Sequence, residues 1–549
     1  MNKKKIDKFL VAGIALAWAL FQLSLPRLII LDSTTIRTIH LAFAISLVFL
    51  TIPFAKDKKK RDTFDSTRSI PLIDYILAGI ACLCVLYFVL DWTGISMRAG
   101  LPIQRDIVMS VILIVLLLEA SRRAIGPAIT IIAVLFTLYA FFGSYMPMIF
   151  AFQGVSLRRY VSQMVLSTEG IFGIPLHVSA NTVFLFVLFG SMLEKVGAGQ
   201  FFNDLSLSLF GRFKGGAGKA AVVSSGLTGL VSGSSIANVV TTGTFTIPLM
   251  KKVGYPAKIA AATEVAASTN GQLMPPIMGA AAFIIAEYLG IDYLDVVKAA
   301  AVPAFVSYFA LFYIVHLEAS KLGMKGMSRE DVPEFLAVIK EGFYFLIPLV
   351  VLLYVLIIKR YTPNLAAFYS ILVLAAVIFI REIVKSVINR ANIFKAVTGF
   401  FGIIAEGLIA GSKNMLSVAL ATATAGIIVG ILFMGISGMV VDIVADLSMG
   451  YIFPLLSITA IASLILGMGL PTTATYIVMA SITVLIIITT LSSAGEIIFI
   501  PLIAAHLFCF YFGILADDTP PVGLAAYTAA AIAKSDPIKT GIQGFIYDL

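Results

Sequence analysis

The chain has 549 residues, of which 60% are hydrophobic and only 13% are charged, whereas soluble domains carry about 25% charged residues. Many charge-free runs reach the ~20 residues that a helix needs to cross a bilayer, which predicts an all-α polytopic membrane protein and excludes a transmembrane β-barrel. The net charge of +9 comes from basic residues in short loops, where they set orientation, and it does not indicate nucleic-acid binding.

Four spans are predicted first, at about residues 9–31, 40–54, 70–90 and 107–118. Basic clusters mark alternate ends of these spans, so the positive-inside rule places the N-terminus and the loops at 56–61 and 122–123 in the cytoplasm. The first apolar run has no obvious small-residue cleavage site, which favours a span over a removed signal peptide. Residues 1–124 are therefore predicted as a four-helix region and residues 125–549 as the remainder.

The next part of the remainder alternates spans with amphipathic segments. Spans are predicted at 127–142, 174–193, 296–315, 343–358 and 365–380. The amphipathic segment at 157–166 is compatible with a position along the membrane interface. A further amphipathic piece is predicted at 201–213, and a comparable amphipathic arm at 393–410. A polar loop is predicted at 321–341.

The apolar stretch at 220–250 is bounded by lysines on both sides, at Lys219 before it and Lys251 after it. Both flanks should be cytoplasmic, yet the stretch is too short for two spans of ~20 residues. We expect a re-entrant hairpin with its turn at Ser232–Ser235 near the middle of the bilayer. The segment 257–290 should then cross outward as a helix broken at 270–276.

The second half repeats this pattern from the other face. No Lys or Arg occurs between Lys413 and Lys534. A second hairpin is predicted at 451–491, with its turn at 467–473 and its opening outside, and a second broken helix at 497–533 returns to a cytoplasmic Lys534. Hairpins that enter from opposite faces are what an inverted repeat requires. The first repeat covers about 200–290 and the second about 393–533.

Both pairs of elements are interrupted by polar and helix-breaking residues. The broken helices even match in sequence, as PPIMGAAAF at 275–283 and PPVGLAAY at 520–527. Irregular backbone survives in a bilayer only when it is buried in protein or lines a polar cavity. Paired interruptions in corresponding positions are typical of a transporter binding site, although two unrelated kinked helices with ordinary packing glycines remain an alternative.

Hydroxyls, amide oxygens and carbonyls freed at broken helices are ligands that suit Na⁺. The first predicted ion site consists of Ser232, Gly233, Ser234, Asn238, Asn270 and Gly271. The second consists of Gly467, Gly469, Thr472, Thr473, Asp517 and Asp518. Half-helix N-termini suit a carboxylate substrate, for which the candidate residues are Ser235, Gln272, Pro275, Pro471, Thr472 and Thr519.

Asp517 and Asp518 are the sharpest chemical feature, since carboxylates at membrane depth are costly and functional by default. Adjacent aspartates point in different directions, so at most one should face the cavity. A cation ligand, a proton carrier and a helix-capping or packing role remain open for them. Glu264 is expected either to support the ion site from behind or to pair with Lys258.

No catalytic constellation accompanies these residues. Three cysteines and four scattered histidines match no zinc or haem site, and no nucleotide-binding loop motif is present. The sequence therefore predicts a protein that is not an enzyme and has no organic cofactor.

The motifs SGSS at 232–235, NG-x-x-x-PP at 270–276 and GMGLPTT at 467–473 resemble those of the membrane component of TRAP transporters, the tripartite ATP-independent periplasmic transporters. The four extra N-terminal spans look like the small subunit of that family fused to the large one. Together with DDTPP at 517–521, this arrangement is similar to the fused type that works with TAXI-class binding proteins.

The resemblance implies sodium-coupled uptake of an organic acid by an elevator mechanism, with Na⁺ as the coupling ion. It also implies a soluble extracytoplasmic, or periplasmic, binding protein as the partner that delivers the substrate. The chain would then lie in a prokaryotic cytoplasmic (inner) membrane with both termini in the cytoplasm. The alternative is a carboxylate symporter of the wider dicarboxylate-type superfamily, coupled to Na⁺ or H⁺, that needs no binding protein. A channel or a membrane enzyme fits less well.

Overall fold

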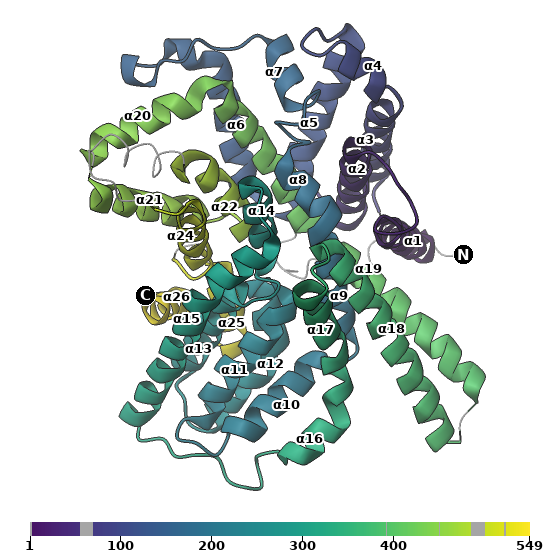
Figure 1. Cartoon of the computed structure of the whole chain (residues 1–549), viewed down its shortest axis with the longest axis vertical. Helices are drawn as coiled ribbons and strands as arrows, with labels where there is room; N and C mark the ends of the chain where they lie inside the picture. Colours follow the sequence, from purple (N-terminus) through teal and green to yellow (C-terminus); the bar gives the residue numbers. More distant parts are fainter. Residues whose placement is uncertain (1–2, 55–69, 391, 450, 485–499, 521–522) are drawn as a thin grey trace. The chain divides into compact units, whose positions relative to one another are not determined.

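The computed structural model describes residues 3–54, 70–390, 392–449, 451–484, 500–520 and 523–549 (Figure 1). Every regular element in these ranges is a helix. Among the described residues, eight helices are long and apolar enough to cross a membrane. The prediction of an all-α, polytopic membrane protein is confirmed at this level.

The chain forms two compact units, and each is built from three separate stretches. Unit 1 comprises Met1–Phe184, Ser412–Ser463 and Thr473–Cys509. Unit 2 comprises Leu185–Gly411, Leu464–Thr472 and Phe510–Leu549. These boundaries differ from the predicted division at residue 124, because the chain returns to each unit after leaving it.

Four long helices begin unit 1, where the first four spans are predicted. They are α1 (Lys3–Ser24), α2 (Ser33–Thr51), α3 (Leu72–Leu90) and α5 (Gln104–Ala124), with the short α4 (Trp92–Met97) between the last two. Helix α2 packs against α1, α3 and α5. The predicted loop at 56–61 lies outside the described residues.

Two ion networks join the ends of these helices. Arg98 Nε donates to Asp106 at 2.8 Å and Arg98 Nη2 to Asp91 at 2.6 Å. The Arg98 guanidinium lowers the pKa of Asp106 to about 2. Arg123 meets Asp74 at 2.7 Å with both side chains almost fully buried. Breaking a buried pair leaves an uncompensated charge, so this contact fixes α3 against α5.

The rest of unit 1 contains the predicted fifth span and the first amphipathic segment. Before the chain first leaves unit 1, this part forms the helices α6 (Pro127–Phe142), η1 (Gly143–Tyr145), η2 (Met148–Phe150), α7 (Leu157–Met164), α8 (Ile174–Val178) and η3 (Ser179–Val183). Helix α7 buries Tyr160, Val161 and Met164 and leaves its basic face exposed, as the amphipathic pattern predicts.

The first hairpin and the first broken helix lie in unit 2. After α9 (Phe184–Lys195) and α10 (Ala198–Phe210), the hairpin consists of α11 (Gly216–Ser232) and α12 (Ser235–Lys252). These two helices pack side by side and α10 packs against both (Figure 1). The broken helix follows as α13 (Ala257–Asn270), η4 (Gly271–Leu273) and α14 (Gly279–Leu289). The predicted interruptions at 232–235 and 270–276 are present.

The middle of the chain is more helical than predicted. Its elements are α15 (Tyr293–Lys321), α16 (Phe335–Gly342), η5 (Phe343–Phe345), α17 (Leu346–Leu353), η6 (Tyr354–Ile358), α18 (Pro363–Ile388) and α19 (Ile393–Ile431). The polar loop ends where α16 begins. The predicted arm at 393–410 forms the first part of α19, which continues beyond it to a length of 39 residues.

The second half contains helix interruptions at the predicted places. Its elements are η7 (Leu432–Ile436), α20 (Ser437–Ser448), α21 (Ile452–Gly467), α22 (Thr472–Met479), η8 (Ala480–Val484), α24 (Leu502–Ile514), η9 (Leu515–Asp517) and α25 (Leu524–Ala533). Parts of the predicted second hairpin and broken helix, including Pro521, lie outside the described residues.

A final helix, α26 (Pro537–Asp548), was not predicted. Asp536 caps its N-terminus by accepting the backbone N–H of Lys539 at 2.8 Å, and Pro537 occupies the first turn, where its missing N–H costs nothing. Helix α26 packs against α13, α15 and α25 in unit 2.

Glycines allow the first hairpin to lie directly on the first broken helix. A Cβ added at Gly229 would stand 2.6 Å from Gly271 Cα, and one at Gly233 would stand 2.8 Å from Gly279 Cα. Gly233 also has a φ of +59°, which side-chain-bearing residues adopt only with strain. The backbones of two interrupted elements therefore touch at two successive points.

Replacing Gly229 with alanine should destabilise unit 2, because its methyl group would meet backbone that cannot rotate away. Overpacking of this kind costs about 1–3 kcal/mol, and it should appear as a lower Tm of the purified protein in detergent. Gly402→Ala, at a helical glycine with no atom within 4 Å of the added methyl, is the matched control. Equal Tm values for the two variants would contradict the close approach.

Candidate functional site

The carboxylate of Asp517 collects polar side chains from three interrupted segments of unit 2. Its Oδ2 atom accepts from Ser235 Oγ at 2.5 Å, from Gln272 Nε2 at 2.9 Å and from Thr472 Oγ1 at 3.2 Å. Ser235 begins α12, Gln272 lies in η4 and Thr472 begins α22. We call these four residues the Asp517 cluster. It joins residues from both halves of the chain.

The cluster is almost closed to solvent. Ser235, Gln272 and Asp517 are exposed by only 2%, 4% and 7%. Burying a carboxylate is costly unless hydrogen-bond donors satisfy its oxygens. The cluster supplies three such donors. Each donor belongs to the side chain of a residue that stands at a helix interruption.

The break in the first broken helix is itself held by α15. The hydroxyl of Tyr293 donates to the carbonyls of Pro276 and Ile277, at 2.5 and 2.9 Å. The hydroxyl of Tyr308 donates to the carbonyl of Ala267 at 2.9 Å. Helix α15 thus occupies carbonyls that the break frees, and it fixes the position of η4 in front of Asp517.

Asp518 points away from this cluster, as expected for adjacent aspartates. Its Oδ1 atom accepts from Thr269 Oγ1 at 2.6 Å. The neighbouring Asn270 donates its Nδ2 to Asp548 Oδ1 at 3.0 Å and accepts from Ser307 Oγ at 2.7 Å. A second polar group therefore forms between α13, α15, α26 and the residue that follows η9.

The first predicted ion site is spread over several surroundings. Ser232 and Ser234 bond to each other within the hairpin turn, and Ser234 also caps α12. Asn238 is buried and donates to the carbonyl of Ser225 at 2.9 Å. Gly233 and Gly271 form the close backbone approaches to α14 and α11. Asn270 is directed toward α26 and α15.

The second predicted ion site is also divided. Thr472 and Asp517 meet in the Asp517 cluster, whereas Asp518 accepts from Thr269 of α13. Gly467 ends α21, and Gly469 has a φ of +102° in the turn before α22. Thr473 is buried in α22 and belongs to unit 1.

Three of the candidate substrate residues, Ser235, Gln272 and Thr472, converge on Asp517. Pro275 and Pro471 lie half-buried in the two breaks. Thr519 uses its hydroxyl locally, on the carbonyl of Leu515 at 2.7 Å. The division of the motif residues into ion and substrate ligands stays a prediction.

Sequence reasoning missed Thr269, Ser307 and Asp548. Asp548 had a signal, because Asp536 followed by Pro537 is a typical helix start and predicts a helix that carries Asp548. Thr269 and Ser307 had none, since hydroxyls are frequent in apolar helices and only the fold brings these two together.

Glu264 does not pair with Lys258 among the described residues. It is fully buried and accepts from the hydroxyls of Thr246, at 2.5 Å, and Thr242 on α12. This carboxylate therefore joins α13 to the second helix of the hairpin. The alternative role, behind the site, stays a prediction.

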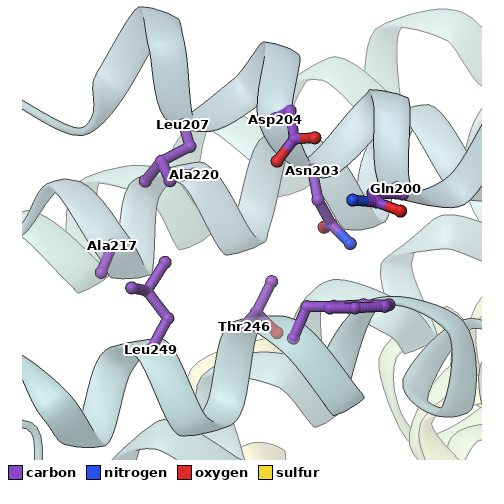
Figure 2. A pocket seen from close by; sticks show the side chains of 9 residues that line it. Gln200, Asn203, Asp204, Leu207, Ala217, Ala220, Thr246 and Leu249 are labelled. Carbon is purple, nitrogen blue, oxygen red and sulfur yellow. The ribbon is translucent and has the colours of Figure 1, made fainter. Parts of the chain in front are cut away.

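A separate small cavity of about 90 Å³ lies among α10, α11 and α12 (Figure 2). Figure 2 shows Gln200, Asn203 and Asp204 of α10 facing Thr246 and other residues of the hairpin. The cavity is lined by Gln200, Asn203, Asp204, Leu207, Ala217, Ala220, Phe245, Thr246 and Leu249. It contains none of the predicted site residues.

Relatives of the chain are membrane permease components. It is 27% identical over 191 residues to the C4-dicarboxylate TRAP transporter large permease protein DctM of Pseudomonas aeruginosa, a match that covers 35% of this chain and 44% of that protein. It is 24% identical to the 2,3-diketo-L-gulonate TRAP transporter large permease protein YiaN of Escherichia coli (36% and 46% covered). It is 25% identical to the sialic acid TRAP transporter large permease protein SiaM of Vibrio cholerae (34% and 43%).

The chain thus spans about half the length, or slightly less, of these curated relatives. A family model described as "Tripartite ATP-independent periplasmic transporter, DctM component" matches residues 112–547. This match covers most of the chain and all four residues of the Asp517 cluster. The chain therefore belongs to the family of DctM components of tripartite ATP-independent periplasmic transporters.

Proposed function

We propose that the protein carries out sodium-coupled secondary active uptake of an organic acid that an extracytoplasmic binding protein of the TAXI type delivers. The observation that carries this proposal is the Asp517 cluster, in which one buried carboxylate joins residues at the starts of α12 and α22 and at the break after α13. A site that depends on both halves changes when either half moves, which is what alternating access requires.

The chemistry of the cluster supports a monovalent cation. The carboxylate of Asp517 balances one positive charge, and the hydroxyls of Ser235 and Thr472 can rotate to present lone pairs to an ion. The turn glycines Gly233 and Gly469 have positive φ values, and carbonyls at such turns are the proposed neutral oxygens. Sodium is accordingly the proposed coupling ion.

The helix termini support an anionic substrate. Helices α12 and α22 begin at Ser235 and Thr472, and the N-terminal ends of helices carry partial positive charge. The names of the three relatives mention a C4-dicarboxylate, 2,3-diketo-L-gulonate and sialic acid, which are all organic acids. A carboxylate is therefore the proposed substrate class.

The proposed mechanism is an elevator. The hairpins would be re-entrant from opposite faces and, with the broken helices, would move against a scaffold that includes the small-subunit-like residues 1–124. Both termini would lie on the cytoplasmic side of a prokaryotic inner membrane. The packing of α11 on η4 and α14 through glycines supports movement of these elements as one body.

Uptake by the purified protein in liposomes should require both an inward Na⁺ gradient and the binding protein encoded with it. The substrates to test are a C4-dicarboxylate, 2,3-diketo-L-gulonate and sialic acid, with each factor present or absent. Uptake with Na⁺ or H⁺ alone would instead favour a symporter that needs no binding protein. Uptake without any ion gradient would contradict secondary active transport.

Asp517→Asn should reduce Na⁺-dependent uptake about ten- to hundred-fold, because charge-assisted contacts are worth ~1.5–3 kcal/mol and the amide cannot balance a cation. The measurement is the Na⁺ concentration that gives half-maximal uptake. Asp295→Asn, which removes an exposed carboxylate that pairs with Lys298, is the control. Equal Na⁺ dependence in both variants would exclude Asp517 as the ion ligand.

Cysteines placed at the exposed ends of the first hairpin should test its topology. In a background without Cys82, Cys84 and Cys509, Lys214→Cys and Lys251→Cys should both react with a membrane-impermeant maleimide from the cytoplasmic side only. Reaction of the two positions from opposite sides would show a crossing segment and refute the re-entrant hairpin.

A further inference from the structure

The small cavity among α10, α11 and α12 has a polar wall that α10 provides. Gln200, Asn203 and Asp204 are three and four residues apart on this helix, so they share one face. Figure 2 shows this face turned toward the hairpin helices. Polar side chains of an amphipathic helix ordinarily occupy the solvent side, so a polar face that lines a cavity suggests a ligand.

Asp204 has no partner for its charge. Its carboxylate forms no hydrogen bond or ion pair within the part of the chain that the structure describes. Helix α16 packs against α10 and carries a second acidic residue, Glu341. Burial raises the pKa of Asp204, and the negative charge of Glu341 raises it further. A positively charged ligand would stabilise the ionised form of this carboxylate.

Asn203 lacks the opposite kind of partner, a hydrogen-bond acceptor. Its Oδ1 atom accepts from Ser224 Oγ on α11, which fixes the orientation of the amide. Its Nδ2 atom is buried and has no acceptor among the described residues, which is costly. Thr246, the polar residue that α12 adds to the lining, donates its hydroxyl to Glu264 at 2.5 Å. The cavity therefore combines a carboxylate that lacks a cation with an amide N–H that lacks an acceptor.

The opposite wall of the cavity is apolar. Ala217 and Ala220 belong to α11, and Leu249 belongs to α12. The volume of about 90 Å³ is several times the ~30 Å³ that one water molecule occupies in the liquid. A bare metal ion would leave the apolar wall and Asn203 Nδ2 without contacts. A short alkyl chain with an ammonium group at one end and an oxygen at the other would contact all of them.

The cavity also reaches the protein surface beside an apolar side chain. Phe245 forms part of its lining and is 54% exposed, and Gln200 is exposed as well. Helix α10 is not among the eight helices that are long and apolar enough to cross a membrane. Lys195 precedes it and Lys214 follows it, so the positive-inside rule predicts a place at the cytoplasmic interface, where lipid headgroups lie.

We propose that this cavity binds the ethanolamine headgroup of a phospholipid, with the ammonium group at Asp204 and a phosphoester oxygen at Asn203 Nδ2. A primary ammonium donates a charge-assisted hydrogen bond to the carboxylate and balances its charge. The two methylene groups of the headgroup lie against Ala220, and the acyl chains leave past Phe245. The proposal does not depend on which ion or substrate the transporter carries.

Other common headgroups match the cavity less well. The quaternary ammonium of choline carries the same charge but has no N–H group to donate to Asp204. The glycerol headgroup of phosphatidylglycerol brings no positive charge, so its phosphate would face the carboxylate without compensation. The cavity should therefore discriminate between phospholipids by the chemistry of their headgroups.

The test uses the full-length protein in detergent with added phosphatidylethanolamine, phosphatidylcholine or phosphatidylglycerol that carry the same acyl chains. Native mass spectrometry counts the bound lipid molecules, and the Tm as a function of lipid concentration reports the affinity. Phosphatidylethanolamine should raise the wild-type Tm at lower concentration than the other two lipids, because a ligand that binds only the folded protein stabilises it.

Asp204→Asn keeps the shape of the side chain and removes its charge. The concentration of phosphatidylethanolamine that gives half of the Tm shift should rise about ten- to hundred-fold, because a charge-assisted contact is lost. Without lipid, the variant should be at least as stable as wild type, since an uncompensated charge is gone. Ala220→Leu, which fills the cavity, should also lose the response. Asp295→Asn, which removes an exposed carboxylate paired with Lys298, should keep it.

Equal responses of the wild type to phosphatidylethanolamine and phosphatidylcholine would overturn the proposal, and so would a response that Asp204→Asn leaves unchanged. Glycerophosphoethanolamine, which has the headgroup without acyl chains, tests the source of the ligand and should compete only at higher concentration. Tighter binding of this soluble compound than of the lipid would overturn the lipid assignment. Because no measurement involves uptake, a failure here is distinguishable from a failure of the proposed transport function.

Discussion

The arrangement of unit 2 depends on one buried carboxylate, that of Asp517. A buried carboxylate must find hydrogen-bond donors inside the protein. Ser235, Gln272 and Thr472 each stand at a helix interruption, and the side chain of each donates to the same Oδ2 atom. The dependence is mutual. The carboxylate can be buried only if these donors bond to it, and the donors in turn need an acceptor. The four residues thus stabilise one another and not only their own segments.

This polar contact is possible only because the backbones come close. Ser235 and Gln272 reach one carboxylate since α11 and the hairpin turn lie directly on η4 and α14, through Gly229 and Gly233. Any side chain at these positions would hold the elements apart by more than a hydrogen bond tolerates. The glycines of the motifs therefore allow close backbone packing, in addition to the role in exposing carbonyls that the sequence suggested. The same backbone contacts set the shape of the site and bring its polar side chains together.

The sequence predicted the helices and their interruptions, which depend on local residue patterns. It did not predict the contacts between residues that lie far apart in the chain. Hydropathy and helix-breaking residues located the spans and the interruptions at 232–235 and 270–276. Hydropathy did not reveal that α19 continues for 39 residues, because an apolar run does not mark where one helix continues and where another begins. Grouping ligands by neighbourhood in the sequence separated Ser235 from Asp517, although they bond at 2.5 Å across 282 positions. Asp548, which accepts from Asn270, lies on α26, beyond the end of the predicted topology at Lys534.

The two neighbouring aspartates show how a single residue step separates two chemistries. The Oδ2 atom of Asp517 receives three hydrogen-bond donors, whereas Asp518 receives Thr269 at Oδ1 and its Oδ2 atom has no donor among the described residues. One step along the chain thus directs one carboxylate toward the starts of α12 and α22 and the next carboxylate toward α13.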